Sequence, residues 1–178
     1  MAILGVDDFK SKLRGGGARP NLFQVTINYP GYAGGDPELT AFLCEGAQLP
    51  GSSFGIINVP FRGRILKMAG DRTFPEWTIT VINDTDFGVR NAMERWMNGI
   101  NNHAQNTGLA SPIAYEADLF VDQLDRGGNA IKRYVFRGAF PQDISSIDLS
   151  YATTDEIERF TVTFAYQYFD SQLPQTTT

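Results

Sequence analysis

The sequence predicts a mainly β domain, a β-sandwich or small barrel with one α-helix packed against it. Two observations lead to this prediction. Several segments alternate apolar and polar residues with a period of two, and one long stretch, 86–101, places apolar residues at helical spacing. One helix cannot cover two sheets, so the strands must largely cover each other. The length of 178 residues suits a single domain.

The two ends of the chain are expected to lie outside this domain. Residues 1–20 are predicted to form a flexible arm, because three consecutive glycines at 15–17 break any helix that begins before them. Residues 21–169 are predicted to form the domain, and residues 170–178 a C-terminal tail.

The first strand is predicted in residues 21–29, where Phe23, Val25 and Ile27 alternate with polar residues. A loop rich in Gly and Pro follows at 30–37. We expect the second strand from Leu39 to Glu45.

Residues 46–74 are too rich in glycine for a stable helix and too apolar for an ordinary solvated loop. The sequence predicts a long extended hairpin or loop whose apolar side chains pack on a neighbouring subunit. Its expected contact residues are Leu49, Phe54, Ile56, Ile57, Val59, Phe61, Arg62, Asp71 and Arg72. For Asp71 and Arg72, a pair with a neighbouring chain and a local turn stabilised by Asp71 are both open.

The rest of the chain contains further predicted strands and the one helix. The helix at about 86–101 carries Val89, Met93, Trp96 and Ile100 in one apolar stripe, and Asn83 to Asp86 offer several N-caps. The expected strands are 76–83, 115–124, 130–140, which Pro141 should end, and 156–169.

Three strands have a polar face that carries almost no charge. These faces consist of Gln24 and Thr26, of Thr78 and Thr80, and of Thr161, Thr163 and Gln167. A water-facing sheet usually carries Lys and Glu, which also discourage edge pairing. The neutral faces therefore suggest strands that meet neighbouring copies within a ring, although β-propensity alone would also favour threonine.

Catalytic and metal chemistry has few candidate residues. The only histidine, His103, lies in an Asn- and Gln-rich loop, and the only cysteine, Cys44, lies in an apolar run. The sequence thus predicts no enzyme, catalytic residue, metal, cofactor or small-molecule substrate. No signal peptide is expected, and the formal charge of −5 argues against a protein that grips nucleic acid.

Two stretches resemble a known family. One is Arg19-Pro20-Asn21-Leu22-Phe23, and the other is Gly70-Asp71-Arg72-Thr73-Phe74 followed by Trp77. Together they resemble the tail tube proteins of contractile-tailed bacteriophages (myoviruses), which are related in fold to type VI secretion tube proteins. The resemblance covers about residues 18–169. The loop at 30–37 and the C-terminal tail are longer than the family pattern.

The resemblance implies a structural subunit of the virion tail, assembled in the host bacterial cytoplasm. It implies hexameric rings in which every copy adds strands to an inner β-barrel, and rings that stack through the segment 46–74. The implied partners are other copies, the tail sheath, the tape-measure protein, the baseplate and the tail terminator. DNA would pass without specific binding, and six copies would carry a charge of −30, six times −5, which repels phosphates.

Three other functions remain open. A tube of a phage-derived injection system, such as a tailocin or a type VI system, shares every physical argument above. A baseplate-proximal tube initiator would make one ring only. A ligand-binding β-sandwich would need an exposed aromatic platform, whereas Trp77 and Trp96 both lie on apolar faces.

Overall fold

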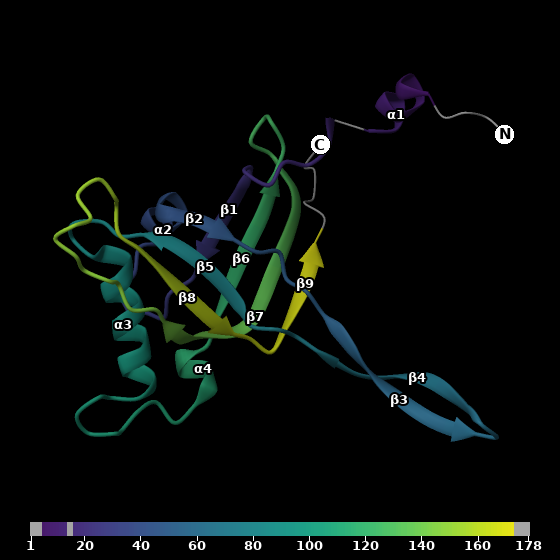
Figure 1. Ribbon diagram of the computed structural model, residues 1–178. Helices are drawn as coiled ribbons and strands as arrows, with labels where there is room; N and C mark the ends of the chain where they lie inside the picture. The colour runs from purple at the N-terminus through teal and green to yellow at the C-terminus, as the bar shows by residue number, and fades with distance from the viewer. Residues whose placement is uncertain (1–4, 14–15, 173–178) are drawn as a thin grey trace.

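A computed structural model describes residues 5–13 and 16–172 of the chain (Figure 1). The strands in these residues are β1 (Phe23–Ile27), β2 (Cys44–Ala47), β3 (Ser53–Phe61), β4 (Arg64–Thr73), β5 (Trp77–Ile82), β6 (Ala117–Leu124), β7 (Ala130–Ile144), β8 (Arg159–Ala165) and β9 (Tyr168–Gln172). The helices are α1 (Val6–Lys12), α2 (Pro37–Leu43), α3 (Gly88–Ile100) and α4 (Pro112–Tyr115). None of the described helices is both long and apolar enough to cross a membrane.

The long strand β7 belongs to two antiparallel sheets. Its first half pairs with β6 and β9, and β6 also pairs with β1; we call this the first sheet. Its second half pairs with β8, which continues to β5 and β2; we call this the second sheet. In Figure 1 the second sheet crosses in front of the first. The hairpin of β3 and β4 forms a separate two-stranded sheet.

The core fills the space between the two sheets and the helix α3. Trp77 of β5 stacks on Phe136 of β7 with ring centroids 4.3 Å apart, so the sheets contact each other directly. From α3, Val89, Met93 and Trp96 are buried in the same cluster. The predicted mainly β fold, with strands that cover each other and a helix against them, is confirmed.

The predicted helix at about 86–101 is observed as α3, but none of the residues predicted as its N-cap, Asn83 to Asp86, occupies that position. Among the predicted caps, Asp84 accepts a hydrogen bond from the backbone N–H of Gly88 at 2.8 Å. Phe87 occupies the N-cap position in the left-handed region, at φ 53°. The apolar stripe then faces the core, as its spacing predicts.

The strand expected from Leu39 to Glu45 is wrong, because α2 occupies most of this stretch. Asp36 caps the helix by accepting from the N–H of Glu38 at 2.9 Å, and Pro37 stands at its first position. An Asp-Pro pair at the end of a loop therefore begins a helix here. The strand β2 starts only at Cys44.

Two further strand boundaries also differ from the prediction. Pro141 does not end the strand expected at 130–140, because β7 continues to Ile144 and the pairing with β8 is irregular between Pro141 and Asp143. Such an irregularity accommodates a residue that has no N–H to donate. The single strand expected at 156–169 is two strands, because the chain bends at Gln167, whose N–H donates to the carbonyl of Arg137 at 3.0 Å.

The ends of the chain also contain regular structure. Besides α3, the predicted helix, the described residues contain three shorter helices, α1, α2 and α4. The exposed helix α1 lies within the arm predicted at 1–20, and β9 covers residues 170–172 of the predicted tail. Residues 1–4, 14–15 and 173–178 lie outside the described residues.

Candidate assembly interface

The hairpin formed by β3 and β4, residues 53–73, projects away from the body (Figure 1). Phe61 pairs with Arg64, which leaves Arg62 and Gly63 as a two-residue turn. Both turn residues have positive φ, 46° and 81°. This is the pattern of a type I′ turn, whose twist matches that of the two strands. The extended hairpin predicted as one of two forms for 46–74 is thus observed.

Both faces of this hairpin are exposed and largely apolar. Ile57, Val59 and Phe61 share one face with Leu66 and Met68, which pair with Val59 and Ile57 across the strands. The exposed apolar side chains of the hairpin are Phe54, Ile56, Ile57, Val59, Phe61, Ile65, Leu66 and Met68. A two-stranded ribbon is marginally stable in water, and apolar area of this kind marks an interaction surface.

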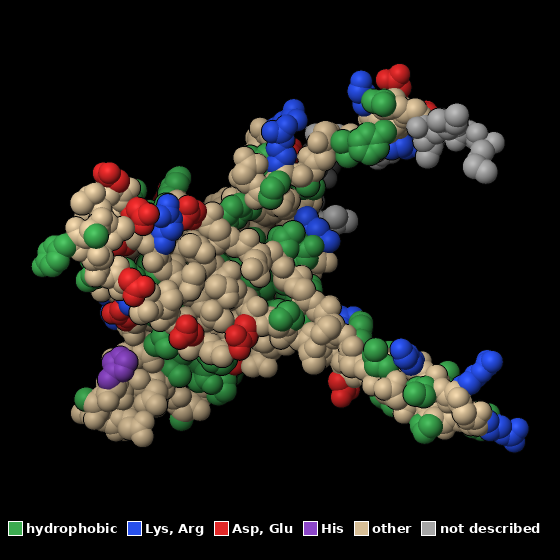
Figure 2. Space-filling view, viewed as in Figure 1, with side chains coloured by type: hydrophobic (Ala, Val, Ile, Leu, Met, Phe, Trp, Pro, Cys, Tyr) green, Lys and Arg blue, Asp and Glu red, His purple; other side chains and the backbone are tan. Residues whose placement is uncertain are grey.

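The hairpin also differs from the body in charge. It carries four cationic side chains, Arg62, Arg64, Lys67 and Arg72, against one carboxylate, Asp71, a net charge of +3. The remaining residues carry 11 cationic and 19 anionic side chains, a net charge of −8. Figure 2 shows basic and apolar side chains along the hairpin. It also shows acidic side chains on the body, including the part of the body most distant from the hairpin.

The family-like motif around Phe74 and Trp77 fixes the base of the hairpin. The hydroxyls of Thr73 and Ser53 lie 2.7 Å apart at the last pair of the ladder. Phe74 packs edge-on against Phe169 of β9, with ring centroids 5.6 Å apart. Trp77 donates from Nε1 to the carbonyl of Gln48 at 2.6 Å and so holds the chain that enters β3. Leu49, the first predicted contact residue, lies exposed in this entering segment.

A bulge bends the hairpin near its base, between Phe54 and Ile56. A Cβ on Gly70 would lie 3.1 Å from the carbonyl oxygen of Gly55, so the motif glycine permits a close approach of the two backbones. The Arg72 guanidinium lies over the ring of Phe54, 4.6 Å from its centroid. The reading of a local turn at Asp71 is wrong, because Asp71 lies within β4.

The other motif stretch, Arg19 to Phe23, closes a turn before β1. The N–H of Leu22 donates to the carbonyl of Arg19 at 3.2 Å, and Pro20 and Asn21 lie between them. Gln123 of β6 donates from Nε2 to the carbonyls of Arg19 and Leu22, both at 2.7 Å. These contacts set the direction in which the N-terminal segment leaves the body.

The neutral faces lie in two places. On the second sheet, Thr78 pairs with Thr163 and Thr80 with Thr161, and the hydroxyls of the first pair are 3.0 Å apart. Their strands β5 and β8 are paired on both sides, so only their outward face is available to other molecules. Gln24 and Thr26 lie instead on the edge strand β1, and Gln167 lies in the bend before β9.

Apart from the β3–β4 hairpin, three strands of the described body have an open edge. β1 and β2 end the order of the strands, and β9 pairs on one side only, with β7. Open edges carry unpaired backbone donors and acceptors that can pair with another chain. The two sheets do not close into a barrel within one copy.

The outward face of the first sheet differs from the neutral face of the second, because it carries ion pairs. Arg133 donates to Asp122 at 2.7 and 2.6 Å, and Arg137 pairs with Asp118 and Asp170. The hydrogen bond to Asp118 raises the pKa of the Arg137 guanidinium above its ordinary value. The charges on this face therefore largely satisfy each other.

The residues that could carry chemistry lie apart. Cys44 is buried, and burial raises the pKa of its thiol to about 11. His103 lies exposed in a loop after α3. In residues 5–13 and 16–172, no three His, Cys, Asp or Glu side chains are grouped so that they could hold a metal ion. Trp77 and Trp96 are both buried and offer no platform for a ligand.

The predicted contact residues do not include several residues of the candidate interface. Ile65, Leu66 and Met68 of β4 are exposed beside the predicted residues of β3, and Arg64 and Lys67 add charge. The available signal was the group of apolar residues Ile65, Leu66 and Met68, which follows Gly63 as the apolar residues of β3 precede it.

Comparison with known proteins places this arrangement in a family. The family model described as phage tail tube protein matches residues 18–172. The chain is 33% identical to the tail tube protein of Serratia phage KSP90 over 90% of this chain and 93% of the relative. It is 31% identical to the tail tube protein gp19 of Enterobacteria phage T4 over 93% of this chain and 99% of the relative.

A solved structure shares the fold at lower identity. It is that of the sheath–tube complex of an extracellular contractile injection system in the extended state, with a TM-score of 0.64 at 16% identity. The match covers 88% of this chain and 92% of the solved chain. The sequence relatives and the family model together decide the assignment: the chain belongs to the phage tail tube protein family.

Proposed function

We propose that this protein is the structural subunit of the inner tube of a contractile phage tail, and that it acts by assembly rather than catalysis. Tail tube proteins are components of the virion tail, and the relatives that match nearly the whole chain are tail tube proteins. The observation that carries the proposal is the β3–β4 hairpin, whose apolar side chains are exposed on both faces in a single copy.

Assembly would cover this hairpin and complete the open strand edges. Copies side by side in a ring, which we infer to be hexameric, would pair the edges left open at β1, β2 and β9. Copies in the next ring would cover the hairpin. The predicted contact residues Leu49, Phe54, Ile56, Ile57, Val59, Phe61, Arg62, Asp71 and Arg72 stay a proposal for this stacking contact. Gln24, Thr26 and Gln167 stay a proposal for contacts between copies in the ring, whereas Thr78, Thr80, Thr161 and Thr163 would face the channel that the ring encloses.

We expect the sheath, the tape-measure protein, the baseplate and the terminator to be the other partners. The sheath is supported by the structural neighbour, which was solved as a sheath–tube complex. A tube of a phage-derived injection system would assemble from the same contacts, and that function is the second candidate.

The outward face of the second sheet suits the wall of the channel. Its centre carries threonine hydroxyls, which do not attract phosphates, and Glu76 and Asp143 are acidic groups at the neighbouring strand ends. If this face lines the channel, Glu76→Lys with Asp143→Lys in the phage slows DNA ejection. Ejection at the normal rate from such particles contradicts the proposal that this face lines the channel.

Electron microscopy of the purified protein tests the proposed function. The wild-type chain, alone or on isolated baseplates, should form tubes, whereas a variant with Ile57→Thr and Phe61→Thr should not. Both substitutions keep β-propensity and remove apolar area that is exposed in the single copy, so the body should stay folded.

The matched control is Ile113→Thr, which removes an exposed apolar side chain of the short helix α4. It should leave the tubes intact. Single particles from the wild-type chain under both conditions contradict the proposed function.

A further inference from the structure

The loop between β7 and β8, residues 146–158, which we call the acidic loop, is a second exposed apolar region. Leu149, Tyr151 and Ile157 are exposed in it. A groove of about 440 Å³ runs along the loop and is lined by Ile147, Leu149, Ile157, Asp148, Glu156 and Glu158, together with Arg159, whose guanidinium is paired with Glu45. The groove thus combines apolar side chains with a rim of carboxylates.

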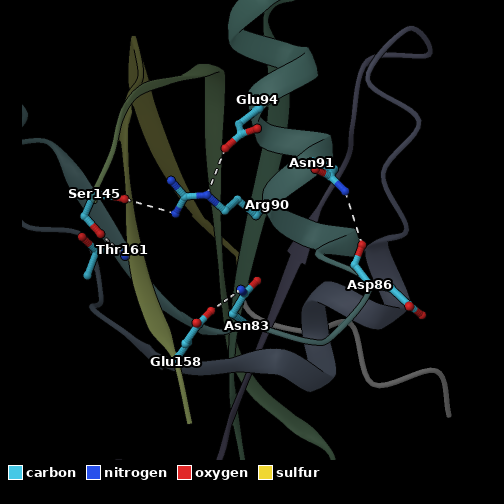
Figure 3. Close-up of polar contacts among 8 residues, drawn as sticks. All are labelled: Asn83, Asp86, Arg90, Asn91, Glu94, Ser145, Glu158 and Thr161. Atoms are coloured by element: carbon cyan, nitrogen blue, oxygen red, sulfur yellow. Dashed lines mark hydrogen bonds and ion pairs between the residues drawn. The ribbon is translucent and has the colours of Figure 1, made fainter. Parts of the chain in front are cut away.

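Both ends of the acidic loop are tied to the body (Figure 3). At its start, Arg90 of α3 donates to the carbonyl of Ser145 at 3.2 Å, and the N–H of Thr161 donates to the hydroxyl of Ser145 at 2.9 Å. At its end, the backbone and side-chain amides of Asn83 donate to the carbonyl and carboxylate of Glu158, both at 2.9 Å. The two ends of the loop are therefore fixed to the body within a single copy.

Charges without partners lie on this loop and on the hairpin. Among the described residues, Asp148, Asp155 and Glu156 take part in no ion pair, and neither do the cationic side chains of the hairpin. Arg62 and Arg64 lie at the hairpin tip beside exposed Phe61 and Ile65. The tip therefore combines apolar side chains with positive charge, and the groove combines apolar side chains with mostly negative charge.

The two surfaces cannot meet within one copy. In Figure 1 the acidic loop lies at one end of the body, beyond the upper end of α3, and the hairpin leaves from the opposite end. Two copies related by a shift along this direction would bring the hairpin tip of one toward the acidic loop of the other. A contact between two different surfaces repeats without closing when the copies are related by a shift along an axis, which is what a tube requires.

We propose that the tip of the β3–β4 hairpin docks in the groove of the acidic loop of a copy in the next ring. This inference rests on the proposed function, which requires stacking, and adds the surface that receives the hairpin. Phe61 and Ile65 pack against Leu149 and Ile157, while Arg62 and Arg64 lie opposite Asp155 and Glu156.

Charge reversal and its repair test the contact. The hairpin reversal is Arg62→Asp with Arg64→Glu, and Asp suits the first position of a type I′ turn. The loop reversal is Asp155→Lys with Glu156→Lys. Each reversal alone should raise the protein concentration needed for tube formation about tenfold, and the chain that carries both reversals should return close to the wild-type value.

Other outcomes of these experiments would overturn the docking proposal alone or both proposals together. A loop reversal that polymerises like the wild type, or a combined variant that is no better than the hairpin reversal, overturns the docking proposal. If the Ile57→Thr and Phe61→Thr variant still fails to form tubes in that case, the proposed function stands and only the receiving surface is wrong. If the wild-type chain forms no tubes, both proposals fall.

Cysteine cross-linking gives a second measurement that does not depend on a loss of assembly. Tubes of a chain with Arg64→Cys and Glu156→Cys should yield a ladder of disulfide-linked chains on oxidation, and either single variant should not. Cys44 is buried and serves as the background in all three samples. Assembled tubes of the double variant that yield no ladder contradict the contact.

Discussion

Trp77 stacks on Phe136 across the two sheets and, with the same indole, holds the carbonyl of Gln48 at 2.6 Å. One side chain therefore links the core to the segment that enters the hairpin. The family-like motif around Gly70 to Trp77 has its physical explanation in this link: Gly70 permits the bulge, Phe74 anchors the base on β9, and Trp77 fixes the entering strand.

The first prediction concerns Trp77→Phe. Phenylalanine retains much of the stacking but leaves the carbonyl of Gln48 without its donor, so the free energy of unfolding should fall by about 1–3 kcal/mol. Amide exchange should also become faster in residues 48–54. Urea unfolding and hydrogen exchange of unassembled protein measure both effects. Trp96→Phe, which removes a comparable bond to Tyr115, should cost similar stability without the faster exchange at the hairpin base.

The second prediction concerns Gly70→Ala. The added Cβ would lie 3.1 Å from the carbonyl oxygen of Gly55, so the bulge must open and the direction of the hairpin must change. Tube formation should be reduced, while the thermal midpoint of the body stays within a few degrees. Gly51→Ala is the matched control, because its Cβ would meet only Pro75 at 3.8 Å. Equal assembly of the two variants contradicts the role given to the bulge.

The third prediction concerns Arg72, whose guanidinium lies over the ring of Phe54. Arg72→Ala should weaken assembly, because the exposed hairpin loses a contact of about 0.5–1 kcal/mol near its base. Arg72→Lys keeps the charge but stacks less well, so it should lie between alanine and the wild type. Sedimentation at a series of protein concentrations gives the comparison. Assembly unchanged in Arg72→Ala shows that neither this contact nor a pair with a neighbouring chain matters.

The fourth prediction concerns alkaline pH. Burial raises the pKa of the Tyr29 phenol from 10.0 to about 12 and that of the Cys44 thiol from 9.0 to about 11. Both groups stay protonated in the folded chain at pH values where the unfolded chain ionises. Stability is therefore complete below pH 9 and should fall between pH 9 and 12, by roughly 2 kcal/mol for each group.

Urea unfolding of unassembled protein at pH 8, 10 and 11 measures this dependence. Tyr29→Phe removes the phenol, which loses its proton above about pH 10 in the unfolded chain. Cys44→Ala removes the thiol, which loses its proton above about pH 9 in the unfolded chain. Each variant should show a shallower fall over its own range than the wild type. An equally steep fall in both variants would contradict the assignment.

Periodicity predicted the elements whose stability depends on one buried face. β1, β5 and α3 place the expected residues in the core, because alternation and helical spacing report directly on burial. The start of α2 was missed, because Asp36-Pro37 is common both in turns and at helix N-termini. The bend at Gln167 was missed because both strands around it alternate.

The candidate interface could be predicted in part. An apolar, glycine-rich segment that needs cover is visible in residues 46–74, as are the residues of β3. The partners of Phe74 on β9 and of Trp77 at Gln48 depend on which strands become neighbours, and local patterns do not contain that information. Residues 146–155 of the acidic loop belong to no predicted strand or helix, and the hydrogen bonds that anchor its ends at Ser145 and Glu158 come from neighbours that only the structure shows.

Each copy has one β3–β4 hairpin, and this hairpin leaves from one end of the body only. A polymer built on such a contact has polarity: one terminus displays bare hairpins and the other displays the surfaces that would receive them. Growth and capping then require different chemistry at the two termini. A repeating contact of this kind does not limit the number of subunits, so a component other than this chain must set the final length of the polymer.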